Sequence, residues 1–298
     1  MVLISSLVKL SVEIEEPETN GMLDDIHMMD SLLRDQHVVD YMRTVDERHY
    51  SVTCMTVNIQ NLTLSGVEAI EKMFFSPFQV HRLKLFRSPL LLSMVPWLSK
   101  IIHHPSNTLM ALDIWVHSDS GCLDELWMAL SQTRRIKTLV INNGLPTKSF
   151  SRCMAQIIAV NQSIRNLQIF ECHDVLEICD ALQKNKTIQK FEISSGRHVD
   201  EEGTMHLLDV LRRNTFLVSI YVNTMLREVG PVLEMLRHNP IIEHIHLNHA
   251  LNLHPDLNSI LARNRARKVE ARAKIISAGI GLFYLRTRLF KILIWSFV

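Results

Sequence analysis

A short apolar pattern recurs along most of this chain and constrains its fold more than any other feature. The pattern reads apolar-x-x-apolar-x-apolar, and successive copies begin 24 to 29 residues apart. A fixed period in this range indicates a repeat protein, because each unit supplies a strand and a helix whose apolar faces only stacking can bury. The copies are Cys54/Val57/Ile59, Val80/Leu83/Leu85, Leu109/Leu112/Ile114, Ile136/Leu139/Ile141, Ile164/Leu167/Ile169, Ile188/Phe191/Ile193, Leu217/Ile220/Val222 and Ile242/Ile245/Leu247.

A second pattern lies just before each new strand and predicts where the helices end. Apolar residues stand three, four and seven positions before this place, which is the spacing of one buried helical face. Asparagine tolerates the left-handed backbone that often ends a helix, so we expect it to end helices here in that conformation. In the last five units the residue is Asn161, Asn185, Asn214, Asn239 and Asn264.

Strand, loop, helix and helix end, repeated in this order, resemble the leucine-rich-repeat family, and the helix-containing units are similar to its ribonuclease-inhibitor-like subclass. The resemblance covers about residues 51–268. It implies an α/β solenoid shaped like a horseshoe, with parallel strands on the concave face, helices on the convex face and about eight repeats. The family usually has Asn or Cys three residues past the last inward strand residue, where this chain has Ser88, His117, Gly144, Cys172, Gly196, Met225 and Ala250.

The two ends of the chain do not follow the repeat. We interpret residues 1–21 as a tail, 22–50 as a helical cap on the first repeat, and 269–298 as a basic and then apolar segment. Ile275 to Val298 is long enough to span a membrane, but its three cations would each cost about 2.5–3.5 kcal/mol near the bilayer centre. We therefore favour packing of this segment on the last repeat, with membrane association and a disordered tail as alternatives.

Charge and cysteine content narrow the classes of function. The chain has 32 basic and 31 acidic residues, and this balance argues against a nucleic-acid partner. Its five cysteines show no paired short spacing, and its apolar first residues lack the basic flank of a secretory signal. Both observations favour a reduced, cytoplasmic setting.

Motifs for catalysis and for metal or cofactor binding were not found. The chain lacks a glycine-rich phosphate loop, a Gly-x-Ser-x-Gly turn and a His-Glu-x-x-His helix motif. His244 and His246 alternate with apolar residues and should share the exposed face of one strand, without the further ligands that zinc requires. We predict no enzymatic activity, no cofactor and no metal site.

Strand positions that alternate with the buried ones supply the predicted binding surface, because they face away from the core. The charges among them are mixed, which favours a protein partner over a polyanion. One column across the strands carries three aromatic residues, the usual anchors of protein interfaces, although a loop or the N-terminal segment could cover them instead. The predicted partner-binding residues are Phe86, Trp115, Phe170, Lys84, Asp113, Gln168, Glu192, Tyr221 and His246.

These observations favour a non-enzymatic protein–protein interaction module, such as a scaffold, adaptor or recognition protein, that binds its partner on the concave face. One alternative is a regulator of the GTPase-activating type, since some leucine-rich-repeat proteins have this activity. Another is a substrate adaptor of a ubiquitin ligase, which would need an F-box near residues 22–44, where no proline-anchored F-box pattern is found.

Overall fold

The computed structural model describes residues 10–15, 51–58, 71, 74, 79–86, 90, 92–105, 107–116, 123–144, 147–172, 174–194, 199–224, 226, 228–247, 254–271 and 273–274. The predicted helical cap at 22–50 and the apolar segment at 275–298 lie outside these residues. No helix in the described ranges combines the length and the apolar character that crossing a membrane requires.

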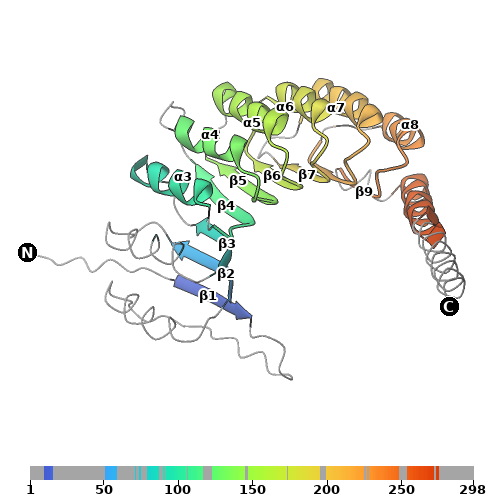
Figure 1. The fold of residues 1–298 in the computed structure, drawn as a ribbon. Helices are drawn as coiled ribbons and strands as arrows, with labels where there is room; N and C mark the ends of the chain where they lie inside the picture. Colours follow the sequence, from blue (N-terminus) through green and yellow to red (C-terminus); the bar gives the residue numbers. More distant parts are fainter. Residues whose placement is uncertain are drawn as a thin grey trace, which may run out of the picture.

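One sheet runs through the described residues, with its nine strands side by side in sequence order (Figure 1). β1 pairs antiparallel with β2, and every later strand pairs in parallel with the strand before it. The repeat pattern did not predict β1, which lies in the segment interpreted as a tail. The strands are β1 (Leu10–Glu15), β2 (Ser51–Asn58), β3 (Gln79–Phe86), β4 (Ala111–Val116), β5 (Thr138–Asn143), β6 (Asn166–Phe170), β7 (Lys190–Ser194), β8 (Ser219–Val222) and β9 (His244–His246).

Helices alternate with the strands from β3 onward and lie together on one side of the sheet (Figure 1). We call the opposite side the sheet face. A further helix, which includes residues 255–271 and which we call the C-terminal helix, leaves this helical layer at the end of the sheet. The helices between strands are η2 (Leu92–Met94), α3 (Val95–His103), α4 (Asp124–Gln132), α5 (Lys148–Val160), α6 (Val175–Lys184), α7 (Glu201–Arg213) and α8 (Gly230–His238).

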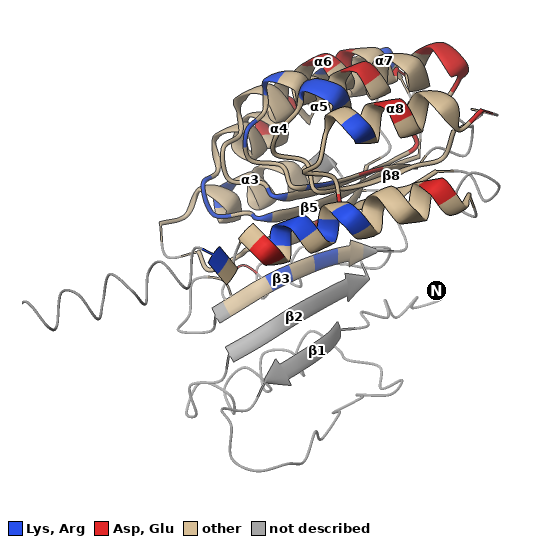
Figure 2. Cartoon of the chain, turned by 90° about the vertical axis from the view of Figure 1, so that its right-hand side faces the viewer, with Lys and Arg blue, Asp and Glu red and all other residues tan. Residues whose placement is uncertain are grey.

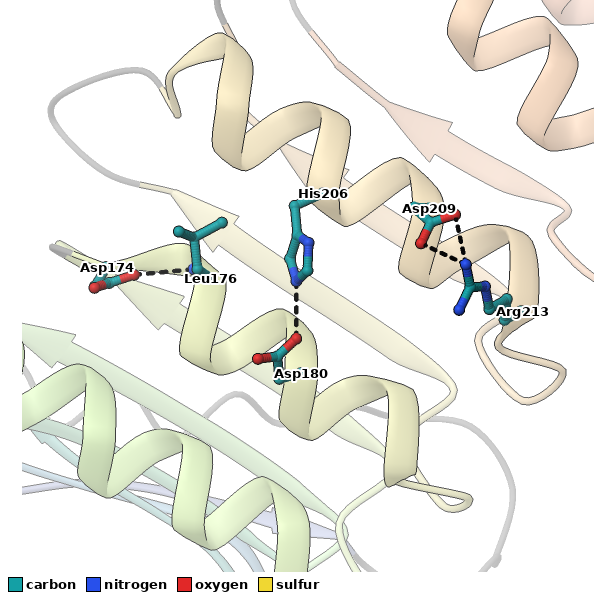
Figure 3. Close-up of polar contacts among 6 residues, drawn as sticks. All are labelled: Asp174, Leu176, Asp180, His206, Asp209 and Arg213. Atoms are coloured by element: carbon teal, nitrogen blue, oxygen red, sulfur yellow. Dashed lines mark hydrogen bonds and ion pairs between the residues drawn. The ribbon is translucent and has the colours of Figure 1, made fainter.

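Side chains at the helix ends and between helices form polar contacts in the helical layer (Figure 3). Asp174 caps α6, because its carboxylate accepts a hydrogen bond of 3.0 Å from the backbone N–H of Leu176. His206 of α7 lies 2.8 Å from the carboxylate of Asp180 on α6, so a polar contact joins neighbouring units. Within α7, Arg213 pairs with Asp209 one turn earlier at 3.0 Å.

The core lies between the sheet and the helices, and the repeat pattern predicted its strand residues. Leu139, Leu167 and Ile220 are each no more than 2% exposed, and their neighbours on the same strands point to the sheet face. Helix residues at the predicted spacing, such as Ile157 and Ile158, are buried against them. The described chain is therefore an α/β repeat solenoid whose strands from β2 onward are parallel.

The register predicted for the first strand is wrong by two residues. In the structure Met55 pairs with Leu83 and Val57 pairs with Leu85, whereas the prediction matched Val57 with Leu83. The reason is that the pattern apolar-x-x-apolar-x-apolar fits this segment twice, once from Cys54 and once from Val52. Strand pairing selects the second fit, in which Val52 pairs with Val80.

The recurring asparagines end helices as predicted from α5 to α8, but the predicted left-handed conformation is wrong. Asn161, with φ −70° and ψ 129°, has the extended backbone that is also found at the other three ends. Its side-chain N–H groups donate to the carbonyl oxygens of Leu130 and Thr133 in the preceding unit, at 2.7 and 3.0 Å. Its side-chain oxygen accepts from the backbone N–H groups of Ser163 and Ile164 in the following turn.

Bonds of the same kind recur at Asn185, Asn214 and Asn239, so we call the set the asparagine ladder. Each amide donates to a carbonyl oxygen of the preceding unit and accepts from a backbone N–H of the following turn, which explains why this residue type recurs. The predicted helix end at Asn264 is wrong, because the C-terminal helix continues through this residue. Asn264 donates to the carbonyl oxygen of Ile242 at 2.9 Å, but its own buried oxygen has no partner among the described residues.

Candidate protein-binding surface

Several of the predicted binding residues lie beside one another on neighbouring strands of the sheet face. Strand pairing sets Lys84 beside Asp113, Glu192 beside Tyr221, and Tyr221 beside His246. Neighbouring strands are about 4.8 Å apart, so each pair is within side-chain reach. The columns therefore follow from strand register alone, even though each member comes from a different repeat.

A groove lies where the C-terminal helix approaches the sheet face. Its volume is about 610 Å³, its floor is formed by β5 to β9, and its wall includes Asn258, Leu261 and Arg265 of the C-terminal helix. The ion pair between Lys268 and Glu243 ties this helix to the turn before β9. Of the nine predicted binding residues, the groove brings together Gln168, Glu192, Tyr221 and His246.

Two stacked aromatic rings line the groove. The rings of Tyr221 and His246 are stacked, with centroids 4.4 Å apart and planes 5° from parallel. Tyr221 is nevertheless 37% exposed, and His246 is also exposed. A rigid pair of flat rings that is still accessible gives a partner a contact area that loses little side-chain freedom on binding.

Charged groups surround this aromatic pair. Glu192 is half-buried beside it, and burial raises the pKa of its carboxyl group while the nearby His246 opposes the shift. Lys190, on the same strand, is exposed, and Arg265 reaches the groove from the C-terminal helix. The lining of the groove thus includes two acidic residues, Glu192 and Glu243, two basic residues and the aromatic pair, which suits a mixed polar and apolar protein segment.

A second charged position lies several strands away, outside the groove. Lys84 and Asp113 form an ion pair of 3.7 Å between β3 and β4. Burial raises the pKa of Asp113, although the charges of Lys84 and Arg82 act in the opposite direction. The charged carboxylate of Asp113 is therefore less well solvated on the sheet face than it would be in water. The fold itself does not need an acidic residue at this position.

The aromatic column is not part of the groove. Trp115 on β4 and Phe170 on β6 are half-buried, and the indole Nε1 of Trp115 is buried without a hydrogen-bond partner among the described residues. Phe86 ends β3, but its side chain lies outside the described residues. Trp115 is thus partly covered, as expected if another part of the chain packs on the aromatic column.

Sequence reasoning missed the wall that the C-terminal helix supplies. The available signal is the basic run that includes Arg265, which the sequence indicates only as the flank of the apolar segment. Nothing in the repeat pattern shows that the helix passes Asn264 and approaches the sheet face. Within the described ranges, no cluster of three or more His, Cys, Asp or Glu side chains is arranged to hold a metal ion.

No protein-family model matches the chain, and no curated protein matches it. A solved structure described as "Leiomodin-1 Actin-Binding Site 2 (ABS2)" is similar over 54% of this chain and 99% of its own length, with a TM-score of 0.47 and 15% sequence identity. A similarity of this strength does not transfer a function to this chain.

Proposed function

We propose that this chain is a non-enzymatic protein-interaction module that binds a segment of a partner protein in the groove on its sheet face. The observation that carries the proposal is the stacked and accessible pair of Tyr221 and His246, with Glu192 beside it. Aromatic anchors that are surrounded by polar groups are the usual energetic centres of protein interfaces. Lys84 and Asp113 would contact a longer segment that continues along the sheet.

The number of repeats, their subclass and the shape of the solenoid are part of the same proposal. About eight leucine-rich repeats of the ribonuclease-inhibitor-like kind would form a horseshoe whose concave side is the sheet face. A cytoplasmic protein with this shape would act as a scaffold, adaptor or recognition protein, without a catalytic or metal centre. The GTPase-activating and ubiquitin-ligase alternatives stay predictions, and residues 22–44, on which the latter depends, lie outside the described residues.

Site-specific photo-crosslinking tests the proposed site. Tyr221 is replaced by p-benzoyl-phenylalanine, which keeps an aromatic ring in the lining of the groove, and cells that express the protein are irradiated. The matched control carries the same amino acid at Met128, which is 58% exposed on α4 of the helical layer. Adducts are identified by mass spectrometry after purification under denaturing conditions.

We expect one or a few partner proteins to be attached from position 221 and not from position 128. The same adducts should decrease when Glu192 is replaced by Gln, because the replacement removes the charge beside the aromatic pair. Equal labelling from both positions, or adducts only from position 128, would contradict the proposed site.

A further inference from the structure

A band of basic residues follows one edge of the solenoid, where each helix ends and the next strand begins. We call it the basic rim. In Figure 2 the rim lies at the left-hand ends of the helices, where several of the blue segments are found. Residues of the rim come from the last turns of α6 to α8 and from the connections after α4, α5 and α6. They are Arg134, Arg135, Lys137, Arg165, Lys184, Lys186, Arg212, Arg213 and Arg237.

Helix dipoles explain only part of this rim. Cations in the last turn of a helix are favourable, which accounts for Lys184, Arg212, Arg213 and Arg237. The dipole effect fades beyond the last turn, yet the other five cations lie past the helix ends, in the turns that precede the strands. Helix stability therefore does not require them, and another reason for their placement is needed.

Several of the rim cations are exposed and available to a partner. Arg212 pairs with Glu234 and Arg213 pairs with Asp209, so these two are partly neutralised. Arg135 instead donates to backbone carbonyl oxygens of the preceding turn. In the described part of the chain, five others are exposed and form no ion pair: Arg134, Arg165, Lys184, Lys186 and Arg237.

Two exposed apolar side chains continue the rim at its last two turns. Phe216 and Ile241 are 40% and 39% exposed, and each stands two residues after an asparagine of the ladder. Their backbone N–H groups donate to the side-chain oxygens of Asn214 and Asn239 at 2.8 and 3.0 Å. The backbone at both positions is therefore fixed by the ladder, and the two side chains occupy equivalent, adjacent and outward-facing places.

We propose that the basic rim is a second interaction surface, which binds an acidic polypeptide segment of a partner protein whose charged stretch is followed by apolar residues. The acidic stretch would lie along the turns after α4, α5 and α6, and the apolar residues would contact Phe216 and Ile241. The turns from α4 to α8 span roughly 20 Å at the level of the strands, which corresponds to about six residues of extended chain. This surface is separate from the groove on the sheet face and goes beyond the proposed function.

A protein segment fits this rim better than a nucleic acid. Asp209 and Glu234 lie among the rim cations and would repel a continuous phosphate backbone, while a peptide can place its carboxylates between them. Apolar side chains at one end also have no role in contacts with phosphates. Electrostatic complementarity with an acidic peptide would set its orientation, because only one end of the rim is apolar.

The experiment measures binding of defined probes to the purified full-length protein by fluorescence anisotropy at low ionic strength. The probe is a fluorescein-labelled peptide in which a run of glutamates is followed by Phe and Leu. Comparison probes replace the glutamates by glutamines, replace Phe and Leu by serines, or consist of single-stranded DNA. The rim variant is Arg165→Glu/Lys186→Glu, and the control Lys148→Glu/Arg263→Glu makes the same change in net charge at exposed residues away from the rim.

We expect the rim variant to weaken binding of the acidic peptide by about tenfold or more, and the control by less than about twofold. The variant Phe216→Ser/Ile241→Ser changes no charge and should reduce the advantage of the peptide that carries Phe and Leu. A Tyr221→Ala variant of the sheet-face groove should leave binding of this peptide unchanged, which separates the rim from the groove.

Equal weakening by the rim and control variants would overturn the proposal, because it would show a response to net charge alone. Tighter, rim-dependent binding of the DNA probe would overturn the assignment to a protein partner. If Phe216→Ser/Ile241→Ser changed the binding of no probe, the assignment of Phe216 and Ile241 to the binding surface would be wrong.

Discussion

Two sets of polar residues in the same repeats have opposite environments. Asn185, of the asparagine ladder, is 6% exposed, and its amide bonds to backbone groups of both the preceding unit and the following turn. Tyr221 and His246 on the sheet face are exposed and stack on each other. The ladder residue recurs from unit to unit, whereas the sheet-face residues change from one strand to the next.

This difference separates the residues that hold the fold from those that are free to bind. Every unit must satisfy the same backbone groups where its helix ends, so one residue type solves the problem repeatedly. No such requirement acts on the sheet face, where residues as different as Asp113 and Gln168 occupy one column. Variation at equivalent exposed positions is therefore where a specific partner would be recognised.

Removing one amide of the ladder should produce the largest effect on stability. In Asn161→Ala, the carbonyl oxygen of Leu130 and two buried N–H groups lose their bonds to the amide at once, while the carbonyl oxygen of Thr133 still accepts from the hydroxyl of Ser163. Each such group costs about 1–3 kcal/mol, so we expect the free energy of unfolding to fall by about 3 kcal/mol or more. Urea unfolding followed by circular dichroism measures this change.

The neighbouring residue supplies a control for that substitution. Gln162 is exposed in the same turn, and Gln162→Ala should change the free energy of unfolding by less than about 0.5 kcal/mol. A loss below about 1 kcal/mol in Asn161→Ala would mean that the ladder bonds are not a main source of stability.

Most of the fold could be predicted because two residue patterns repeat. The apolar positions fixed which strand side chains are buried, as at Leu139 and Ile220. The reason for the asparagines could not be found in the same way, since a left-handed helix end and a side-chain bridge between units favour the same residue type. The extended backbone of Asn161 and the N–H groups that donate to its side chain show that the bridge between units is the correct explanation. The strand at Leu10–Glu15 has no repeat pattern, so nothing in the periodicity indicated it.

The candidate site was predictable to a smaller degree. Strand alternation placed Tyr221 and His246 side by side, because register determines columns in a parallel sheet. The groove itself depends on the direction of the C-terminal helix, which no local pattern specifies. The partial burial of Trp115 also depends on surrounding chain that the strand pattern does not include.

The last asparagine should tolerate substitution better than those within the ladder. Asn264 donates to the preceding unit, but its oxygen has no partner among the described residues, because the C-terminal helix continues where a turn would supply N–H groups. Asn264→Ala should therefore lower the free energy of unfolding by about 1 kcal/mol, less than half of the loss in Asn161→Ala. Equal losses in parallel urea titrations would contradict the role assigned to the following turn.

The most direct test combines stability and binding in one variant of the sheet face, Tyr221→Ala. Urea unfolding measures its stability, and its affinity for a partner identified by crosslinking is measured by calorimetry on the same preparation. We predict a change of less than about 1 kcal/mol in the free energy of unfolding and a loss of about 2 kcal/mol or more in binding free energy. A large loss of stability with unchanged affinity would contradict the account and would make Tyr221 a structural residue.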